Sequence, residues 1–570
     1  MTDSLPDLLD DRTHLLQELS QLGDFQPGSI SNVTRRCGKP NCHCAKPSDP
    51  GHGPHRQLTQ KIDGKTVTKT LSSPEALRKA EKEIAEFRRF QKLSHELIEI
   101  NQKICRLRLL ATQSPEKKKT AILIQQEITR ELEHLLQLIF SERGRTGRLD
   151  LEAIEMAMRS AMHQAGATAL TELLKFDPPG PEQRKLPCPC GHTAHYVGLR
   201  SKTVLTAVGE AECLRPYYLC DRCHRGQFPI DVELDIENTE LSPGVRRMLA
   251  MVGQQGAFDQ GRQQVELLAG LFVTTKAVER TAEGIGADIE MRQQRELEQA
   301  LQLNLPIPLG PRIPILYVEM DGTGVPVVRK ETEGRAGKQD GQPAHTREAK
   351  IGCVFTQTTV NEEGYPIRDE DSTTYVGAIE SAEEFGRRLY AEAWRRGWSR
   401  AKKRVVLGDG AEWIWNQADL HFPEATQIVD LYHAREHLGT VAGQLYPDEV
   451  PARRRWLMVK QNKLDNGQIE NLVASLHALE RSHPGLAEIL QTEANYFDQN
   501  KKRMRYPEFR KQGFFVGSGV VEASCKTIVG RLKQSGMFWT VRGANAIVPL
   551  RCCHLSRKFE DYWATRRARA

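Results

Sequence analysis

Two groups of closely spaced cysteines constrain the fold of this chain more than any other feature. The first group holds Cys37, Cys42 and Cys44, and the second holds Cys188, Cys190, Cys220 and Cys223. Short-spaced cysteines in a chain without secretion signals are typical of metal ligands rather than disulfides. A zinc ion held by four such ligands stabilises a segment too small to fold on a core of its own. We therefore expect two small zinc-dependent modules.

The ligand sets leave alternatives open. In the second group, one residue separates the first pair where two or more are usual, so His192 could replace Cys190 as a ligand. The first group lacks an obvious fourth ligand, although three histidines follow it, namely His43, His52 and His55. Zinc is the leading interpretation of both groups, and a structural loop without metal is the alternative for the first.

Length and composition predict several folded domains. The chain has 570 residues, 39% of them hydrophobic and 27% charged, and its mean hydropathy is −0.52, values typical of a soluble globular protein. No run of 18 apolar residues is present, and the first residues are acidic where a signal peptide needs positive charge. We expect a cytoplasmic protein without membrane segments. The net charge of +6 permits nucleic-acid binding without requiring it.

Changes of pattern along the chain predict a multidomain α/β protein. The expected parts are an N-terminal Cys-rich β module (1–72), a helical segment (73–140), a helical region with a Pro-rich linker (141–185), a zinc ribbon (186–233), a helical region resembling a helix-turn-helix (240–304), a mixed α/β region (305–444 and 513–556), a helical insertion within it (445–512) and a basic tail (557–570). Asp63-Gly64 indicates a hairpin turn in the first module. A plain helical hairpin is as good an interpretation of 263–285 as a DNA-reading one.

Carboxylates near glycines mark the α/β region. Asp321 ends the predicted strand IPILYVEM and Asp409 ends RVVLG, and Glu522 lies on a helix opening after Gly-Ser-Gly. Carboxylates from different elements could hold two magnesium ions for phosphoryl transfer, although capping turns or pairing with arginine is the commoner role of such acids. Glu319 competes with Asp321 because it lies on the same face of the strand.

Four ordered motifs then carry a family resemblance. The motifs are EMDGTGVPVVRKE, VVLGDGAEWIWN, IVDLYHAREHL and GSGVVEASCKTIVGRLKQSGMFWTVRGANAIVPLR. They resemble transposases of bacterial insertion sequences in the Kra-type group, distantly related to the Mutator-like transposases. The resemblance covers about residues 150–556. It implies a ribonuclease-H-like catalytic domain with an Asp-Asp-Glu triad at Asp321, Asp409 and Glu522, using magnesium or manganese. The Cys-rich unit at 26–110 resembles a small uncharacterised module found near mobile elements.

The resemblance also gives accessory residues a meaning. Asp430 and His433 match a motif that follows the second catalytic acid in related transposases, where the histidine could hydrogen-bond the aspartate or contact DNA. The helical insertion at 445–512 corresponds to a domain that handles transposon ends in relatives.

Basic and aromatic residues on either side of Glu522 are candidates for DNA contacts. Phosphate neutralisation combined with base stacking is the chemistry that exposed DNA requires. The candidates are Lys501, Lys502, Arg503, Arg505, Arg531, Lys533, Trp539 and Arg542, with Tyr506 and Phe509 as stacking partners. A solvated charged loop, and a core position for Trp539, are the alternatives.

The leading expectation is a transposase, associated with the nucleoid, that binds element ends and target DNA as a homodimer or higher oligomer. It would cut at the ends and join the free 3′ hydroxyl to the target. A structure-specific nuclease or resolvase of the same fold is one alternative, and a zinc-containing DNA-binding regulator without catalysis is another.

Overall fold

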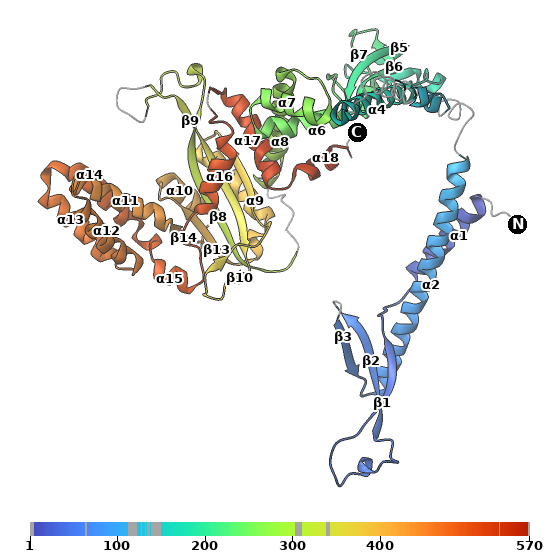
Figure 1. Ribbon diagram of the computed structural model, residues 1–570, viewed down its shortest axis with the longest axis horizontal. Helices are drawn as coiled ribbons and strands as arrows, with labels where there is room; N and C mark the ends of the chain where they lie inside the picture. Colours follow the sequence, from blue (N-terminus) through green and yellow to red (C-terminus); the bar gives the residue numbers. More distant parts are fainter. Residues whose placement is uncertain are drawn as a thin grey trace. The chain divides into compact units, whose positions relative to one another are not determined.

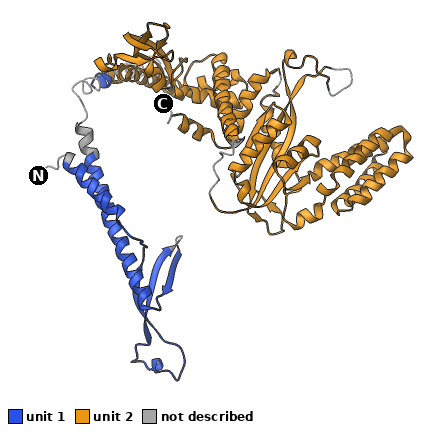
Figure 2. Cartoon of the chain, turned by 180° about the vertical axis from the view of Figure 1, so that it is seen from behind, with its two compact units in different colours: residues 1–126 blue, residues 127–570 orange. Residues whose placement is uncertain are grey.

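The computed structural model describes residues 5–62, 65–111, 122–126, 128–130, 133, 137, 150–301, 310–337, 343–534 and 536–567. The chain divides into two compact units, residues 1–126 and 127–570 (Figure 2). Most of the helical stretch predicted at 114–140, the turn Asp63-Gly64 and the start of the α/β region at 305–309 lie outside the described residues. No helix in the described ranges is both long enough and apolar enough to cross a membrane.

The first unit pairs a three-stranded antiparallel sheet with two helices (Figure 1). Its elements are α1 (Leu5–Ser20), β1 (Ser29–Arg35), β2 (His52–Ile62), β3 (Lys65–Thr70) and α2 (Pro74–Ala111). Leu58 on β2 is buried against Ala80 and Ile84 of α2. Phe25 stacks on Phe90 with ring centroids 4.9 Å apart. This core is small, as expected for a module that also carries candidate metal ligands.

The second unit begins with a helix and an antiparallel ribbon of strands. These are α4 (Leu151–Leu173), β4 (Lys185–Pro187), β5 (Thr193–Thr206), β6 (Gly209–Cys220) and β7 (Gly226–Gln227). Helices α5 (Pro229–Glu233), α6 (Pro243–Gln255), α7 (Phe258–Ala269) and α8 (Thr275–Leu301) follow. Strands β5 and β6 pair along nearly their whole length, from Ala194↔Cys220 to Thr206↔Gly209. The ribbon therefore brings the two cysteine pairs to one end.

A five-stranded mixed sheet forms the centre of the second unit, in the order β12-β9-β8-β13-β14. The strands are β8 (Ile313–Pro326), β9 (Thr346–Gln357), β12 (Thr374–Ala378), β13 (Ala401–Gly408) and β14 (Thr426–Val429). Strands β8, β9 and β12 are antiparallel neighbours, whereas β13 is parallel to both β8 and β14. A short hairpin of β10 (Thr359–Val360) and β11 (Pro366–Ile367) stands beside this sheet.

Helices cover both faces of the sheet. The helices are α9 (Ala382–Arg395), α10 (Glu412–His421), α16 (Gly519–Gly530) and α17 (Val541–Leu555), and α18 (Phe559–Arg567) follows α17. A Cβ at Gly352 would meet Leu389 of α9, so α9 covers that face, whereas Val548 of α17 lies against Gly377 on the other. Because both faces are covered, Leu316, Tyr317 and Val318 in successive positions of β8 are all fully buried.

The helical insertion forms a separate lobe beside β14 (Figure 1). It consists of α11 (Leu431–Leu445), α12 (Val450–Asp465), α13 (Ile469–Ser482), α14 (Ala487–Asn500) and α15 (Tyr506–Lys511). Its helix α11 begins directly after β14, so the lobe starts earlier than the predicted boundary at residue 445.

The helical region at 240–304 is part of the same body as the sheet. Arg388 of α9 is 5% exposed and bonds both Glu290 of α8 and Glu380 through hydrogen bonds of 2.7–2.9 Å. Helix α8 also packs along α17, where Gly286 lies against the backbone of Ala546.

Candidate functional site

The second cysteine group forms a compact set at the end of the β5–β6 ribbon. Cys188, Cys190, Cys220 and Cys223 place their sulfur atoms within 4.8 Å of one another. The Sγ atoms of Cys188 and Cys223 are 3.5 Å apart, and those of Cys190 and Cys220 are 3.6 Å apart. Sulfur atoms bound tetrahedrally to one zinc ion stand about 3.8 Å apart. The four thiols therefore could hold zinc, as predicted.

Backbone turns make the short spacing of the first pair workable. Gly191, at φ +84°, donates its N–H to the carbonyl of Cys188 over 2.9 Å, which turns Cys190 back toward the second pair. Backbone N–H groups of Cys223 and Arg222 lower the pKa of the Cys220 thiol to about 6, which favours the thiolate that binds metal. His192 lies beside the group, its Nδ1 3.6 Å from the Cys190 sulfur. The alternative in which His192 replaces Cys190 is not supported.

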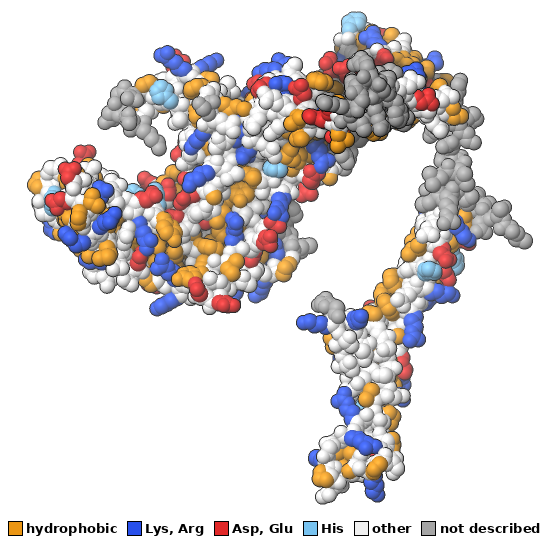
Figure 3. Space-filling model, viewed as in Figure 1, with side chains coloured by type: hydrophobic (Ala, Val, Ile, Leu, Met, Phe, Trp, Pro, Cys, Tyr) orange, Lys and Arg blue, Asp and Glu red, His pale blue; other side chains and the backbone are white. Residues whose placement is uncertain are grey.

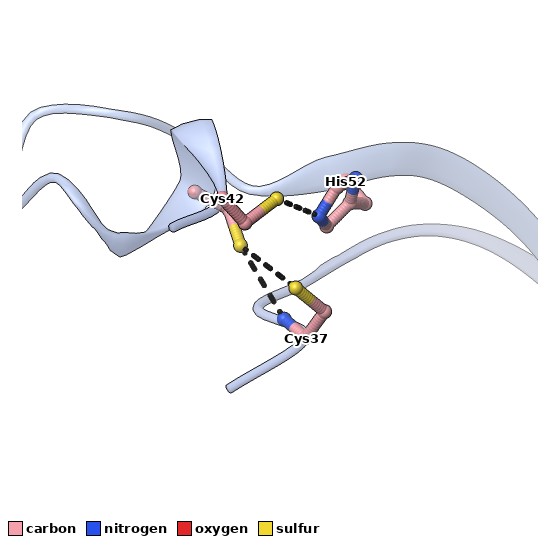
Figure 4. A group of neighbouring side chains, drawn as sticks. Cys37, Cys42 and His52 are labelled. Carbon is pink, nitrogen blue, oxygen red and sulfur yellow. Dashed lines mark hydrogen bonds between the residues drawn. The ribbon is translucent and has the colours of Figure 1, made fainter. Parts of the chain in front are cut away.

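The first cysteine group acquires a fourth ligand in the structure. Cys37, Cys42 and Cys44 gather with His52, the first residue of β2, and their ligand atoms also lie within 4.8 Å of one another (Figure 4). The Nε2 atom of His52 is 3.0 Å from the Cys42 sulfur, and the Cys37 and Cys44 sulfurs are 3.5 Å apart. This Cys-three, His-one set could hold zinc.

The neighbouring histidines have other roles. The His43 ring is turned to Asp49, 3.0 Å away, and His55 sits within β2, paired with Val33. Sequence reasoning missed the assignment of His52 because all three histidines are close in sequence. The strand register selects among them, since β2 begins opposite Arg35, just before Cys37.

The predicted acidic residues meet at one edge of the mixed sheet. Strands β8 and β13 run parallel with Leu407 opposite Glu319, and Gly408 of β13 is opposite Val429 of β14. Continuing both registers aligns Asp321, Asp409 and Asp430 at one level across three neighbouring strands. Strand β8 does not end at Asp321, contrary to our prediction, because pairing with β9 continues to Pro326.

Asp321 and Asp409 are close enough to influence each other. Burial raises the pKa of Asp321, and the negative charge of Asp409 raises it further. Gly322 donates its N–H to Asp321 Oδ1 over 2.6 Å, and Ala411 donates to Asp409 Oδ1 over 2.8 Å. Both side chains are half-buried. The pair therefore concentrates negative charge at a place that solvent still reaches.

Two other carboxylates hold the N-terminus of α16, and we call them the carboxylate clamp. Glu319 Oε2 accepts the N–H of Val521 over 2.8 Å. Asp430 Oδ2 accepts both the N–H of Ser518 and its hydroxyl, the latter over 2.6 Å. Both acids are fully buried, and they satisfy helix-terminal N–H groups that would otherwise lack partners.

The clamp fixes the helix turn that carries Glu522. This residue is exposed and its Oε1 lies 3.5 Å from the Ser518 hydroxyl. Burial raises the pKa of Glu319 to about 8, and its Oε1 atom has no hydrogen-bond partner. Because Glu319 is sealed from solvent while Asp321 is not, the geometry favours Asp321 over Glu319 as the reactive acid of this strand.

His433 does not hydrogen-bond Asp430 through its ring. Asp430 Oδ1 instead accepts the backbone N–H groups of Tyr432 and His433, capping α11. The His433 ring packs edge-on against His437, with centroids 5.0 Å apart. An electrostatic interaction with His433 lowers the pKa of Asp321, so His433 lies near the acidic edge of the sheet.

Only the two cysteine groups, within the described ranges, bring three or more ligand atoms within 4.8 Å of one another. At least one of Asp321, Asp409 and Glu522 is therefore farther from the others than ligands of a single ion.

Several predicted DNA contacts are buried or already paired. Arg531 and Trp539 are 2% and 6% exposed, and the Trp539 indole N–H donates to Leu532 O over 3.0 Å. Tyr506 and Phe509 also belong to the core. Their apolar surface is used in packing, so none of the four can stack on DNA, contrary to our prediction.

The remaining basic candidates differ in whether their side chains are already paired within the protein. Arg503 donates to Gln427 over 2.6 Å, Arg505 is paired with Glu470, and Lys501 is 2.9 Å from Asp498. Lys502, Lys533 and Arg542 are exposed, although Lys533 donates to Thr323 over 2.6 Å. On the visible face, basic side chains are spread among acidic ones rather than gathered in one stripe (Figure 3).

The helix-turn-helix candidate is a helical hairpin, with Gly270 in the left-handed conformation at φ +66° ending α7. Val278, Ala282 and Ile285 of α8 are buried, whereas Lys276 and Arg280 are exposed. The turn exposes Leu267, Leu268 and Phe272 at 69–78%. The exposed surface of the hairpin therefore combines apolar side chains in the turn with basic ones at the start of α8, and both interpretations of the hairpin stand.

Comparison with known families and proteins assigns only the N-terminal part of the chain. Residues 5–82 match a family described as a Domain of unknown function (DUF6788). No curated protein matches the chain. The matched range spans α1, the three-stranded sheet, the first cysteine group and the beginning of α2, so the Cys-rich module includes the helix before it.

Proposed function

We propose that the protein is a DNA transposase with a ribonuclease-H-like catalytic domain and an Asp-Asp-Glu triad at Asp321, Asp409 and Glu522. The observation that carries the proposal is the register of the parallel strands β8 and β13, which pairs Leu407 with Glu319 and, continued by two residues, brings Asp409 level with Asp321. Three antiparallel strands followed by two parallel ones, with β8 at the centre, is the arrangement that a ribonuclease-H-like sheet requires.

The donor set fits magnesium or manganese. Carboxylate oxygens are the ligands these ions prefer, and the pKa of Asp321, raised by burial and by Asp409, reflects a repulsion that a divalent cation would relieve. Asp321, Asp409 and Glu522 would hold the metal. When bound, the metal would supply activation of the attacking oxygen and stabilisation of the leaving one.

The chain's own groups support this chemistry by position. The carboxylate clamp of Glu319 and Asp430 holds Glu522 at the start of α16. Lys533 and Arg542 follow α16 and are exposed, so their charges can reach DNA phosphates. No covalent intermediate with the protein is needed, since water and then a 3′ hydroxyl serve as nucleophiles.

The test uses purified full-length protein, magnesium and labelled DNA carrying the element's ends. Asp321→Asn, Asp409→Asn and Glu522→Gln should each abolish cleavage while end binding is retained, because metal ligation needs the charge. Asp419→Asn, an exposed acid on α10, is the matched control and should cleave normally. Cleavage retained in any triad variant removes that residue from the triad.

The products separate the other candidate functions. Strand transfer to a second DNA supports the transposase. Cleavage without joining would indicate a nuclease or resolvase instead of a transposase. Binding without cleavage would indicate a zinc-containing DNA-binding regulator.

A further inference from the structure

A groove of about 620 Å³ on the second unit borders Glu522. Four segments form this groove: the β10–β11 hairpin, the end of α15, the segment leading into α16 and the first turn of α11. Its wall includes Tyr365, Tyr432, Arg510, Phe515, Gly517 and Glu522. We call it the tyrosine groove.

Two aromatic side chains in the groove are left in solvent. Tyr365 and Tyr432 are 59% and 61% exposed. A Cβ at Gly517 would stand 2.9 Å from the Tyr432 ring, so the absence of a side chain at this position allows the ring to rest on the backbone. The ring is thus held in place on one side while remaining accessible. Exposed flat rings of this kind are suited to stacking against another flat ring.

A positive charge accompanies the rings. Arg510 is exposed, and its guanidinium makes no ion pair or hydrogen bond among the interactions of the described residues. Nearby Arg505, by contrast, is paired with Glu470. Arg510 is therefore free to bind an anionic group of a ligand that occupies the groove.

We propose that the tyrosine groove binds an unpaired nucleotide of the DNA strand, with its base on the rings of Tyr432 and Tyr365 and its phosphate on Arg510. Aromatic platforms beside a cation are the general means of binding single-stranded nucleic acid. A hollow of about 620 Å³ has room for a nucleotide. The inference rests on the proposed function, because it places the unpaired nucleotide next to Glu522 and hence next to the bond that is cut.

The test measures binding of a short fluorescent oligothymidylate to full-length protein without divalent ions, so that no cleavage is involved. Tyr432→Ala and Tyr365→Ala should each weaken binding about tenfold, since a base stacked on an aromatic ring contributes that much. Tyr432→Phe keeps the ring and should bind like the natural protein. Arg510→Ala should weaken binding and lower its dependence on salt.

Controls separate the groove from exposed aromatic residues elsewhere on the molecule. Phe272→Ala removes an exposed aromatic on the turn after α7 and should leave binding unchanged. A 2-aminopurine base in the oligonucleotide should change its fluorescence on binding, and this change should be lost in Tyr432→Ala. Unfolding temperatures of the variants should match that of the natural protein because both tyrosines are exposed.

Unchanged affinity in Tyr432→Ala, Tyr365→Ala and Arg510→Ala would overturn the proposal, as would equal affinity for a blunt duplex. The outcome is independent of the triad test. If binding depends on the tyrosines but the protein cuts no DNA, the proposed function is overturned and the nucleotide site in the groove is retained. If the protein cuts DNA but binding does not depend on the tyrosines, the proposed function is retained and the nucleotide site is overturned.

Discussion

At the scale of single residues, the acids of the α/β region fall into two kinds by their burial. Asp321 and Asp409 are half-buried at the edge of the sheet, while Glu319 and Asp430 are fully buried and bonded to the start of α16. A single strand therefore carries a candidate catalytic acid and a positioning acid two residues apart. Sequence spacing alone treats the two as equivalent.

The role of Glu319 can be tested by comparing two substitutions. Glu319→Gln keeps an oxygen that accepts the Val521 N–H, so we expect DNA cleavage within a few-fold of the natural level. Glu319→Ala leaves that N–H buried without a partner, at a cost of about 1–3 kcal/mol, and should lower both stability and cleavage. Thermal unfolding and cleavage kinetics check both results.

One result would contradict the positioning role. If Glu319→Gln abolished cleavage while its unfolding temperature stayed unchanged, Glu319 would be a metal ligand or an acid-base group. Glu522→Gln, which we expect to be inactive, serves as the reference for that behaviour.

At the scale of elements, each small sheet depends on a ligand set that it brings together itself. The β5–β6 ribbon joins two cysteine pairs, and the strands β1 and β2 join Cys37, Cys42, Cys44 and His52. Neither module has a large core of its own. The cluster around Leu58 in the first contains three buried residues, so metal ligation would add to its stability.

We expect two equivalents of zinc in protein purified without chelators. His52→Ala should lose one equivalent and destabilise the first unit, and the double change Cys220→Ser with Cys223→Ser should lose the other. His43→Ala is the control for His52, because its ring bonds Asp49 instead. Metal analysis by mass spectrometry gives the count, and two equivalents remaining in His52→Ala would remove that histidine from the ligand set.

At the scale of the whole molecule, the chain divides into two compact units, residues 1–126 and 127–570. Residues 240–304 do not stand apart from the α/β sheet. Arg388 connects Glu290 of α8 to Glu380 beside α9, and Arg566 of α18 bonds Asp235 and Asp288. Buried and half-buried ion pairs of this kind make the helical region and the sheet one body.

Fragments of the two units should therefore fold independently. Residues 1–126 and 127–570, expressed separately, should each show cooperative thermal unfolding and each retain one equivalent of zinc, because each contains one complete ligand set. A fragment ending at residue 304 should fail to fold cooperatively, since it loses the partners of α8. A stable, zinc-loaded 127–304 fragment would show that the ribbon and helical region form a domain of their own.

Much of the local structure follows from the sequence by itself. Apolar runs located the strands of the mixed sheet, Gly270 located the turn after α7, and cysteine spacing located both candidate metal groups. These features depend on neighbouring residues, whose preferences the sequence displays directly.

Tertiary structure decided what depends on distant residues. The register of β1 and β2 brings His52 to the three cysteines as a candidate ligand. Glu319 is sealed from solvent where it accepts the Val521 N–H of α16, whereas Asp321 stays half-buried. Arg531 and Trp539 are buried by the helices around them. The tyrosine groove joins the β10–β11 hairpin to segments that follow much later in the chain. Exposure, pairing and the fourth ligand of a metal are properties of packing, which sequence spacing does not contain.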